Sequence, residues 1–166
     1  MFKRIRINTY QVGLVYERDK LVSVLKEGVY YLFGNKRVAV YDTNQMTFPA
    51  LDLNVVLQHE DFVPLVQVVE VADTEIALQF VNANFKGVLT AGRYAFWRGL
   101  NTVTFTKVDL AKVYITEQIP LVLLEHPALR SYVRRYVVLN FEKGLLFVNG
   151  VFAKELAPGS LIQNRH

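Results

Sequence analysis

Three histidines are the side chains of this chain best suited to proton transfer or metal binding near neutral pH, namely His59, His126 and His166. No two of them lie within one helical turn, so their spacing does not predict a pair of metal ligands. The chain contains no cysteine, which excludes a disulfide framework, a thiolate metal site and a cysteine nucleophile. We therefore expect neither a bound metal ion nor another cofactor.

The polar group His59-Glu60-Asp61 comes closest to a catalytic cluster. Acidic residues stabilise the start of a helix, so this group is expected to cap a short helix rather than to catalyse a reaction. His126 stands at the corresponding position of a second, similar segment, whereas a catalytic residue would be needed only once. The chain has no Gly-x-Ser-x-Gly, His-Glu-x-x-His or Walker motif, and we predict that it is not an enzyme.

Five other residues could contact a partner or a charged surface. Arg130, Arg134 and Arg135 form a basic cluster, and Arg98 follows Trp97, the only tryptophan. Trp97 could anchor a partner, or it could be a core or repeat-interface residue. The net charge of +4 is dispersed, which favours an ordinary solvated surface. Binding to an anionic lipid or nucleic acid is the alternative, although a nucleic-acid partner would usually require a stronger cluster.

The elements that position these residues are expected to be strands. Hydrophobic residues make up 52% of the chain and charged residues 20%, which is enough for a buried core, and the many tyrosines and phenylalanines favour strands. The longest uncharged apolar stretches, such as residues 119–124, are far shorter than the ~20 residues of a membrane-spanning helix. The basic N-terminus does not resemble a secretory signal, and a cytoplasmic location is expected.

One segment recurs along the chain, which is typical of a repeat protein. Residues 12–31 align without a gap with residues 76–95, so that Leu14 matches Leu78. A further shift of nearly the same length aligns Leu78 with Leu145 in a third copy. The repeated unit is therefore about 65 residues long, is used twice in full, and begins a third time.

Each copy is predicted to open with a β-hairpin, because apolar residues alternate on both sides of a short polar turn. The turn of the third copy, Asn149-Gly150, is a strong hairpin signal, since such turns need positive φ angles. Gly28, Gly92 and Gly159 follow the hairpins, where we expect positive φ in a turn.

Further elements are predicted between the hairpins. The expected strands are at residues 37–41, 51–56, 67–71, 102–108, 112–115 and 134–139, and the expected short helices are at residues 59–66 and 127–133. The predicted fold class is mainly β (α+β), built from tandem hairpin-rich units that each carry one short helix. The predicted domains are residues 1–73, 74–141 and 142–166.

The ordered set of hairpins carries a family resemblance. Residues 142–159 resemble the opening strands of a stomatin/prohibitin/flotillin domain, also called a band 7 or SPFH domain. Nearly the whole chain is similar to the N-terminal repeat region of bacterial slipin-type proteins of that superfamily, and more distantly to the repeats of the major vault protein. The resemblance lies in the combination of three copies, because a single hairpin followed by Pro-Gly is common.

The resemblance implies a ring-forming, membrane-associated scaffold that binds membrane proteases and has no catalytic residues. The sequence stops before the rest of the band 7 domain, so ring assembly and membrane attachment are expected only of a longer protein. We therefore expect a non-catalytic scaffold or assembly module that self-associates or binds other protein chains. The alternatives are a peptide- or partner-binding module that acts by strand addition, and a peripheral binder of anionic lipid or nucleic acid.

Overall fold

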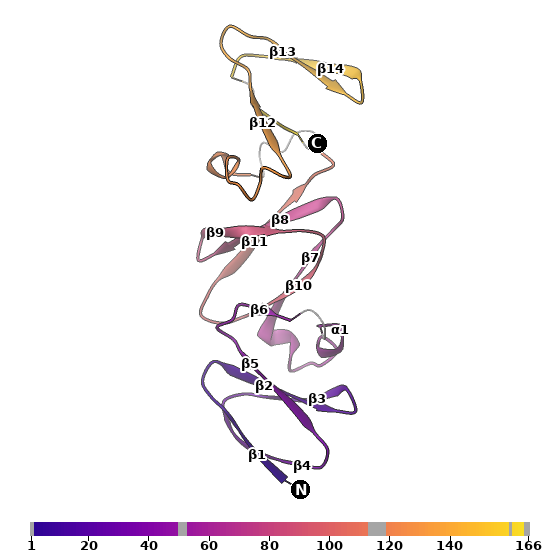
Figure 1. The fold of residues 1–166 in the computed structure, drawn as a ribbon, viewed down its shortest axis with the longest axis vertical. Helices are drawn as coiled ribbons and strands as arrows, with labels where there is room; N and C mark the ends of the chain where they lie inside the picture. Colours follow the sequence, from indigo (N-terminus) through magenta and orange to yellow (C-terminus); the bar gives the residue numbers. More distant parts are fainter. Residues whose placement is uncertain (1, 50–52, 113–118, 160, 165–166) are drawn as a thin grey trace. The chain divides into compact units, whose positions relative to one another are not determined.

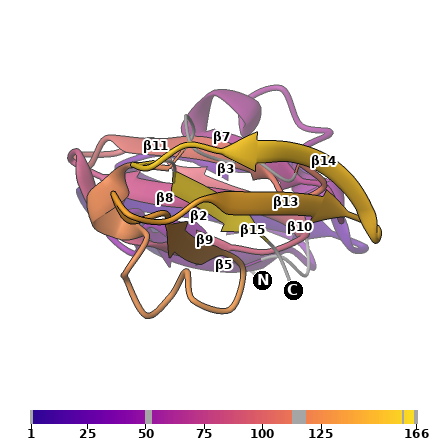
Figure 2. The ribbon, with the colours of Figure 1, turned by 90° about the horizontal axis from the view of Figure 1, so that it is seen from above.

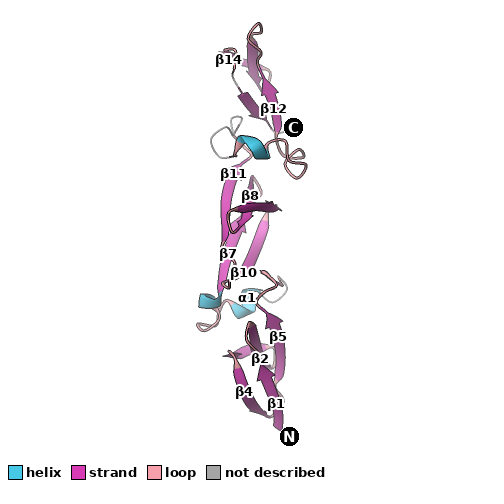
Figure 3. Ribbon diagram, turned by 90° about the vertical axis from the view of Figure 1, so that its left-hand side faces the viewer, coloured by secondary structure: helices cyan, strands magenta, loops and turns pink. Residues whose placement is uncertain are grey.

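The computed structural model describes residues 2–49, 53–112, 119–159 and 161–164, and it is mainly β (Figure 1, Figure 3). The strands are β1 (Phe2–Ile7), β2 (Gln11–Glu17), β3 (Lys20–Leu25), β4 (Gly28–Phe33), β5 (Arg37–Asp42), β6 (Thr47–Phe48), β7 (Val66–Val71), β8 (Glu75–Val81), β9 (Asn84–Leu89), β10 (Gly92–Trp97), β11 (Val103–Asp109), β12 (Arg134–Val137), β13 (Gly144–Val148), β14 (Val151–Leu156) and β15 (Leu161–Asn164). The helical segments are α1 (Leu53–Val56) and the 3-10 turns η2 (Val63–Leu65) and η3 (Leu121–Leu123).

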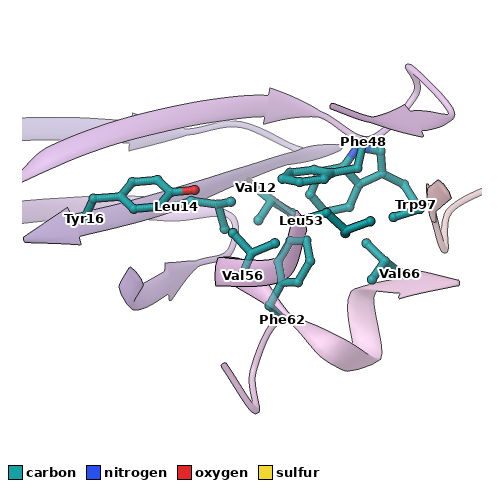
Figure 4. Close-up of a cluster of buried hydrophobic side chains, with 10 residues drawn as sticks. Val12, Leu14, Tyr16, Phe48, Leu53, Val56, Phe62, Val66 and Trp97 are labelled. Carbon is teal, nitrogen blue, oxygen red and sulfur yellow. The ribbon is translucent and has the colours of Figure 1, made fainter. Parts of the chain in front are cut away.

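The first compact unit comprises Met1–Glu70, Val81–Ala83 and Arg93–Val103. It contains a β1-β4 sheet, a β3-β2-β5 sheet and a β6-β10-β7 sheet. The main core of this unit is shown in Figure 4 and consists of Val12, Leu14, Tyr16, Phe48, Leu53, Val56, Phe62, Val66, Ala95 and Trp97. This cluster contains the side chains on one face of β2. A second cluster of Ile7, Val15 and Leu25 contains the side chain of Val15, on the other face of β2. Strand β2 is therefore buried on both faces.

The second compact unit comprises Val71–Phe80, Asn84–Gly92 and Thr104–His166. Its sheets are β11-β8-β9, β12-β15 and β13-β14. Its larger core lies against β8 and consists of Ile76, Leu78, Val108, Leu110, Ile119, Leu124, Leu129 and Val133. A small cluster of Val138, Leu146 and Leu156 lies beneath the β13-β14 hairpin. The larger core thus supports β8, and the smaller one supports β13.

The strands recur at the spacing of the sequence repeat. When Leu14 is aligned with Leu78, four strands of the first copy begin and end at positions that align with the ends of four later strands. The pairs are β1 with β7, β2 with β8, β3 with β9, and β4 with β10. When Leu78 is aligned with Leu145, β9 begins and ends at positions that align with the ends of β14. The last residue of β8 aligns with that of β13, and the last residue of β10 aligns with that of β15. Leu14, Leu78 and Leu145 each lie in the first strand of a hairpin. These positions support the interpretation of the chain as a tandem repeat.

The packing around the hairpins also recurs. When Leu14 is aligned with Leu145, the buried cluster of Ile7, Val15 and Leu25 in the first unit matches, pair by pair, the buried cluster of Val138, Leu146 and Leu156 in the second. A Cβ added to Gly13 would lie 2.7 Å from Cδ1 of Ile7, and one added to Gly144 would lie 2.9 Å from Cγ2 of Val138. A Cβ at either position would therefore force the neighbouring side chain to move.

The three hairpin turns share a left-handed backbone conformation. Both central residues have positive φ in the turn of Arg18 (49°) and Asp19 (61°), and likewise in those of Asn82 (49°) and Ala83 (66°), and of Asn149 (51°) and Gly150 (79°). The expected turn at Asn149-Gly150 is confirmed, as is positive φ at Gly28, Gly92 and Gly159. A pair of positive φ angles matches the twist of the flanking strands, so these turns fix the register of the hairpins.

Ala83 is the residue least suited to its turn, because its Cβ is crowded by the backbone at a φ of 66°. The substitution Ala83→Gly should therefore raise the free energy of unfolding by about 1 kcal/mol. Urea denaturation would measure the change. The control is Ala111→Gly, an exposed alanine without positive φ, which should have no effect or a destabilising one. If the two substitutions changed the free energy of unfolding equally, the backbone at Ala83 would not be strained.

Several sequence predictions for the segments between the hairpins need correction. The predicted strand at residues 51–56 is wrong, because Leu53–Val56 is helical and places Leu53 and Val56 together in the core. The predicted helix at residues 59–66 contains only the 3-10 turn Val63–Leu65. The predicted helix at residues 127–133 is a series of turns, in which Leu129 N donates to the carbonyl of His126 and Tyr132 N to that of Leu129. Most of the predicted strand at residues 112–115 lies outside the described residues.

The compact units divide the chain differently from the predicted repeat domains. Strand β10 belongs to the second sequence repeat, residues 74–141, yet it lies in the first compact unit between β6 and β7. The repeats are therefore divisions of the sequence, and the domain boundaries at residues 73 and 141 stay predictions. The other predicted strands have counterparts in β5, β7, β11 and β12.

Candidate interaction surface

Trp97 is a core residue and not an exposed anchor for a partner. Its side chain is only 4% exposed, and its ring centroid lies 5.4 Å from that of Phe48 and 5.8 Å from that of Phe62, both edge-on (Figure 4). Trp97 ends β10, which pairs with β6 on one side and β7 on the other. The alternative of a surface contact at Trp97 is therefore wrong for this conformation, because neighbouring aromatic rings already cover the indole.

Arg98 is exposed, and the main chain holds its position. Its backbone N–H donates to the carbonyl of Leu65 at 2.8 Å, and its Nε–H donates to the carbonyl of Val66 at 3.0 Å. Both acceptors lie where η2 passes into β7, so Arg98 links this connection to the end of β10. These bonds give Arg98 a structural role beside the main core.

Arg130, Arg134 and Arg135 line one surface cleft of about 450 Å³ together with Glu125 and Tyr136. All three arginines are exposed. The cleft forms because the turns of residues 127–133 lead directly into β12 and bring Arg130 beside the strand. The structure thus brings the predicted basic cluster together and places Arg98 in the other compact unit.

The charges in the cleft are only partly balanced. Nη1 of Arg135 lies 2.7 Å from Oε1 of Glu125 and donates a hydrogen bond to it. Among the described residues, no carboxylate forms an ion pair with Arg130 or Arg134. A guanidinium presents several N–H donors in one plane, so these two side chains could bind a phosphate or carboxylate group.

The β13-β14 hairpin carries an apolar surface that includes none of the predicted site residues. Leu145 and Phe147 of β13 are 60% and 55% exposed, and Val151 and Phe152 of β14 are 69% and 55% exposed. The rings of Phe147 and Phe152 lie 5.8 Å apart across the hairpin, so they cover the same face. We call Leu145, Phe147 and Phe152 the hairpin face, whereas Val151 pairs with Val148 and points to the opposite face. The repeat alignment carries a signal for this surface, because Leu145 and Phe147 align with Leu14 and Tyr16, which other residues of the first unit bury.

The opposite face of this hairpin is covered within the chain. Figure 2 shows β13 and β14 side by side, and their antiparallel register pairs Leu145 with Glu155 and Phe147 with Phe152. Leu146 points to the opposite face, where it is 8% exposed against Val138 and Leu156. Nζ of Lys143 lies 2.9 Å from Oε1 of Glu155, and the hydrogen bond and charge of that carboxylate raise the pKa of Lys143 above its ordinary value.

The two internal histidines make equivalent local bonds. Nδ1 of His59 accepts a hydrogen bond from the backbone N–H of Asp61 at 3.3 Å, and Nδ1 of His126 accepts one from that of Ala128 at 3.2 Å. Each imidazole therefore stabilises a turn by bonding to the residue two positions later. Within the described part of the chain, no three His, Asp or Glu side chains gather closely enough to hold a metal ion. His166 lies outside the described residues.

Among the helices that the structure describes, none is sufficiently long and apolar to cross a lipid bilayer. Comparison with family models, with curated proteins and with solved structures gave no match for this chain. The arrangement of the residues themselves is therefore the basis for any functional interpretation.

Proposed function

We propose that the chain is a non-catalytic assembly module, in which β-rich repeats position an uncovered hairpin for contact with further polypeptide. The observation that supports this most directly is the hairpin face, because Leu145 and Phe147 are exposed where their counterparts Leu14 and Tyr16 are 0% and 3% exposed. Large apolar side chains gathered on one surface are typical of protein–protein contacts. The slipin-type resemblance adds that such a module would belong to a membrane-associated scaffold, with the chain itself on the cytoplasmic side.

Self-association of the 166-residue chain tests this proposal. Sedimentation velocity from low to several hundred micromolar protein should show a species larger than the 19.1 kDa monomer that grows with concentration. The variant Phe147→Lys should shift this equilibrium towards monomer, because it places a charge within the hairpin face. The matched control is Phe2→Lys, which changes a similarly exposed phenylalanine on β1. A chain that stays monomeric throughout would count against the assembly module.

The cleft of Arg130, Arg134 and Arg135 favours a second candidate, a peripheral binder of an anionic surface. Two of its three guanidinium groups form no ion pair with the described residues, so they remain able to bind phosphate groups. Association with phosphatidylserine vesicles that weakens steeply as salt increases, and that is lost in Arg134→Glu, would favour this candidate over the assembly module. Binding to phosphatidylcholine vesicles of the same size would instead indicate an apolar contact.

A further inference from the structure

The basic cleft lies on a segment that both full repeats contain. When His59 is aligned with His126, residues 57–69 match residues 124–136. In each copy the imidazole accepts a hydrogen bond from the backbone N–H two residues later, and the histidine carbonyl accepts one from the N–H three residues later. A strand follows in both copies, β7 in the first and β12 in the second. The two segments therefore share the same local structure.

The three arginines of the cleft stand where the first copy has uncharged residues. The matched pairs are Arg130 with Val63, Arg134 with Gln67, and Arg135 with Val68. The buried positions of the segment stay apolar in both copies, with Phe62 matched by Leu129 and Val66 by Val133. The first copy thus forms the same turns without any of the three guanidinium groups. The repeat itself does not require these arginines, and they distinguish the surface of the second copy from that of the first.

Positive charge exceeds negative charge in the cleft. Three guanidinium groups and the carboxylate of Glu125 line it, which leaves a net charge of +2. Arg135 holds Glu125, whereas Arg130 and Arg134 form no ion pair within the described part of the chain. A single carboxylate or a phosphate diester carries one negative charge and would neutralise only half of this excess. A phosphate monoester carries a charge of about −1.5 to −2 at pH 7, which matches it.

The cleft is also larger than a phosphate group alone. Its volume is about 450 Å³, and its lining includes the apolar residues Leu124 and Val133 together with Tyr136. Small-molecule sites typically combine an apolar lining with a few polar groups that fix the orientation of the ligand. The room and the apolar residues beside the arginines therefore favour an organic phosphate ester over inorganic phosphate.

We propose that this cleft is a binding site for a phosphate monoester, whose phosphate group is bound by Arg130 and Arg134. Each guanidinium can donate two parallel N–H bonds to phosphate oxygens. Arg135 adds positive potential while it holds Glu125. The same chemistry is present in soluble phosphate esters and in lipid headgroups that end in a phosphate monoester. This inference rests on the second candidate function proposed above, whose ligand it specifies, and it does not depend on the assembly module.

An NMR titration of the isotopically labelled full chain with phenyl phosphate tests the site directly. The amide shifts should saturate and should be concentrated at residues 124–136, whereas the matching residues 57–69 should not shift. Diphenyl phosphate has the same aromatic group but a single charge, and it should bind at least about tenfold more weakly at equal ionic strength. Inorganic phosphate should also bind more weakly, because it lacks the carrier group. Succinate supplies two negative charges without phosphate, and its binding as tightly as phenyl phosphate would overturn the inference.

Variants that copy the first repeat test the arginines. Arg134→Gln and Arg130→Val each introduce the residue that the first copy has at the matching position. Because the first copy folds with these residues, both variants should keep the circular dichroism spectrum of the unchanged chain. Each should weaken the binding of phenyl phosphate at least about tenfold. The matched control is Arg4→Gln, which removes an exposed arginine from β1 and should leave the affinity unchanged. Equal affinities of Arg134→Gln and Arg4→Gln would show that the cleft does not bind the phosphate.

Vesicles distinguish the two sources of the phosphate monoester. Phosphatidic acid ends in a monoester and phosphatidylglycerol presents a diester, and the two are compared in phosphatidylcholine vesicles of matched surface potential. A preference for phosphatidic acid that phenyl phosphate competes away supports a lipid ligand, and binding of phenyl phosphate without vesicle binding supports a soluble ester. Equal binding to both vesicles without saturable phenyl phosphate shifts would keep the peripheral binder but overturn this site. Absence of binding to both vesicles and to phenyl phosphate would overturn both proposals.

Discussion

The substitution Phe62→Ala should lower the free energy of unfolding by about 3–5 kcal/mol. Phe62 is 0% exposed, and its ring lies edge-on to Phe48 at 5.1 Å and to Trp97 at 5.8 Å. Truncation to alanine would remove the aromatic contacts and leave a cavity among rigid rings, which cannot close completely. This cost is large compared with the total stability of an ordinary domain.

Urea denaturation followed by the fluorescence of Trp97 would measure this loss at the site itself, because Trp97 is the only tryptophan and lies within the same cluster. The control Phe2→Ala removes a phenylalanine that is 65% exposed in the same compact unit, and it should cost less than about 1 kcal/mol. Similar losses for the two variants would show that the cluster around Phe62 is not closely packed.

The hairpins could be predicted from the sequence because their signals are local and are repeated. Alternating apolar residues define each strand, and a short polar turn such as Asn149-Gly150 defines where the chain reverses. Matching Leu14 with Leu78 located equivalent strands even where the turn residues differ, as at Ala83. A repeated pattern thus compensates for a weak local signal in one copy.

The segments between hairpins could not be predicted as reliably, because they depend on distant contacts. Leu51-Asp-Leu-Asn-Val-Val56 alternates partly like a strand, and a short apolar run does not distinguish a strand from a helix. Helix α1 forms where Leu53 and Val56, at its two ends, can both reach the core beside Phe48. The predicted helix at residues 127–133 was wrong for a different and local reason. The side chain of His126 bonds to Ala128 N, which favours a turn over a continuous helix.

The candidate site residues were predictable as residue types but not as surfaces. The role of Trp97 was decided by its neighbours Phe48 and Phe62, which are far from it in sequence. The hairpin face follows from the absence of a neighbouring strand beside β13 among the described residues, which no residue within β13 could reveal. The convergence of Arg130 with Arg134 required the turns that lead into β12. Tertiary contacts therefore determined which of the expected side chains are accessible.

The same substitution at equivalent positions of two hairpins should have very different effects. Leu78→Ala should lower the free energy of unfolding by about 3–5 kcal/mol, because Leu78 is 0% exposed within the larger core of the second unit. Leu145→Ala should cost less than about 1 kcal/mol, because that leucine is 60% exposed. Circular dichroism during urea denaturation would compare the two variants with the unchanged chain.

The comparison of Leu78→Ala with Leu145→Ala holds the residue type and the repeat position constant. The two sites differ in whether a third strand and its core lie beside the leucine. The difference measures what a neighbour such as β11 and the core behind it add to a leucine that alternates in the same way along its strand. If Leu145→Ala were as costly as Leu78→Ala, Leu145 would already be covered in solution, and the chain would be associating through its hairpin face.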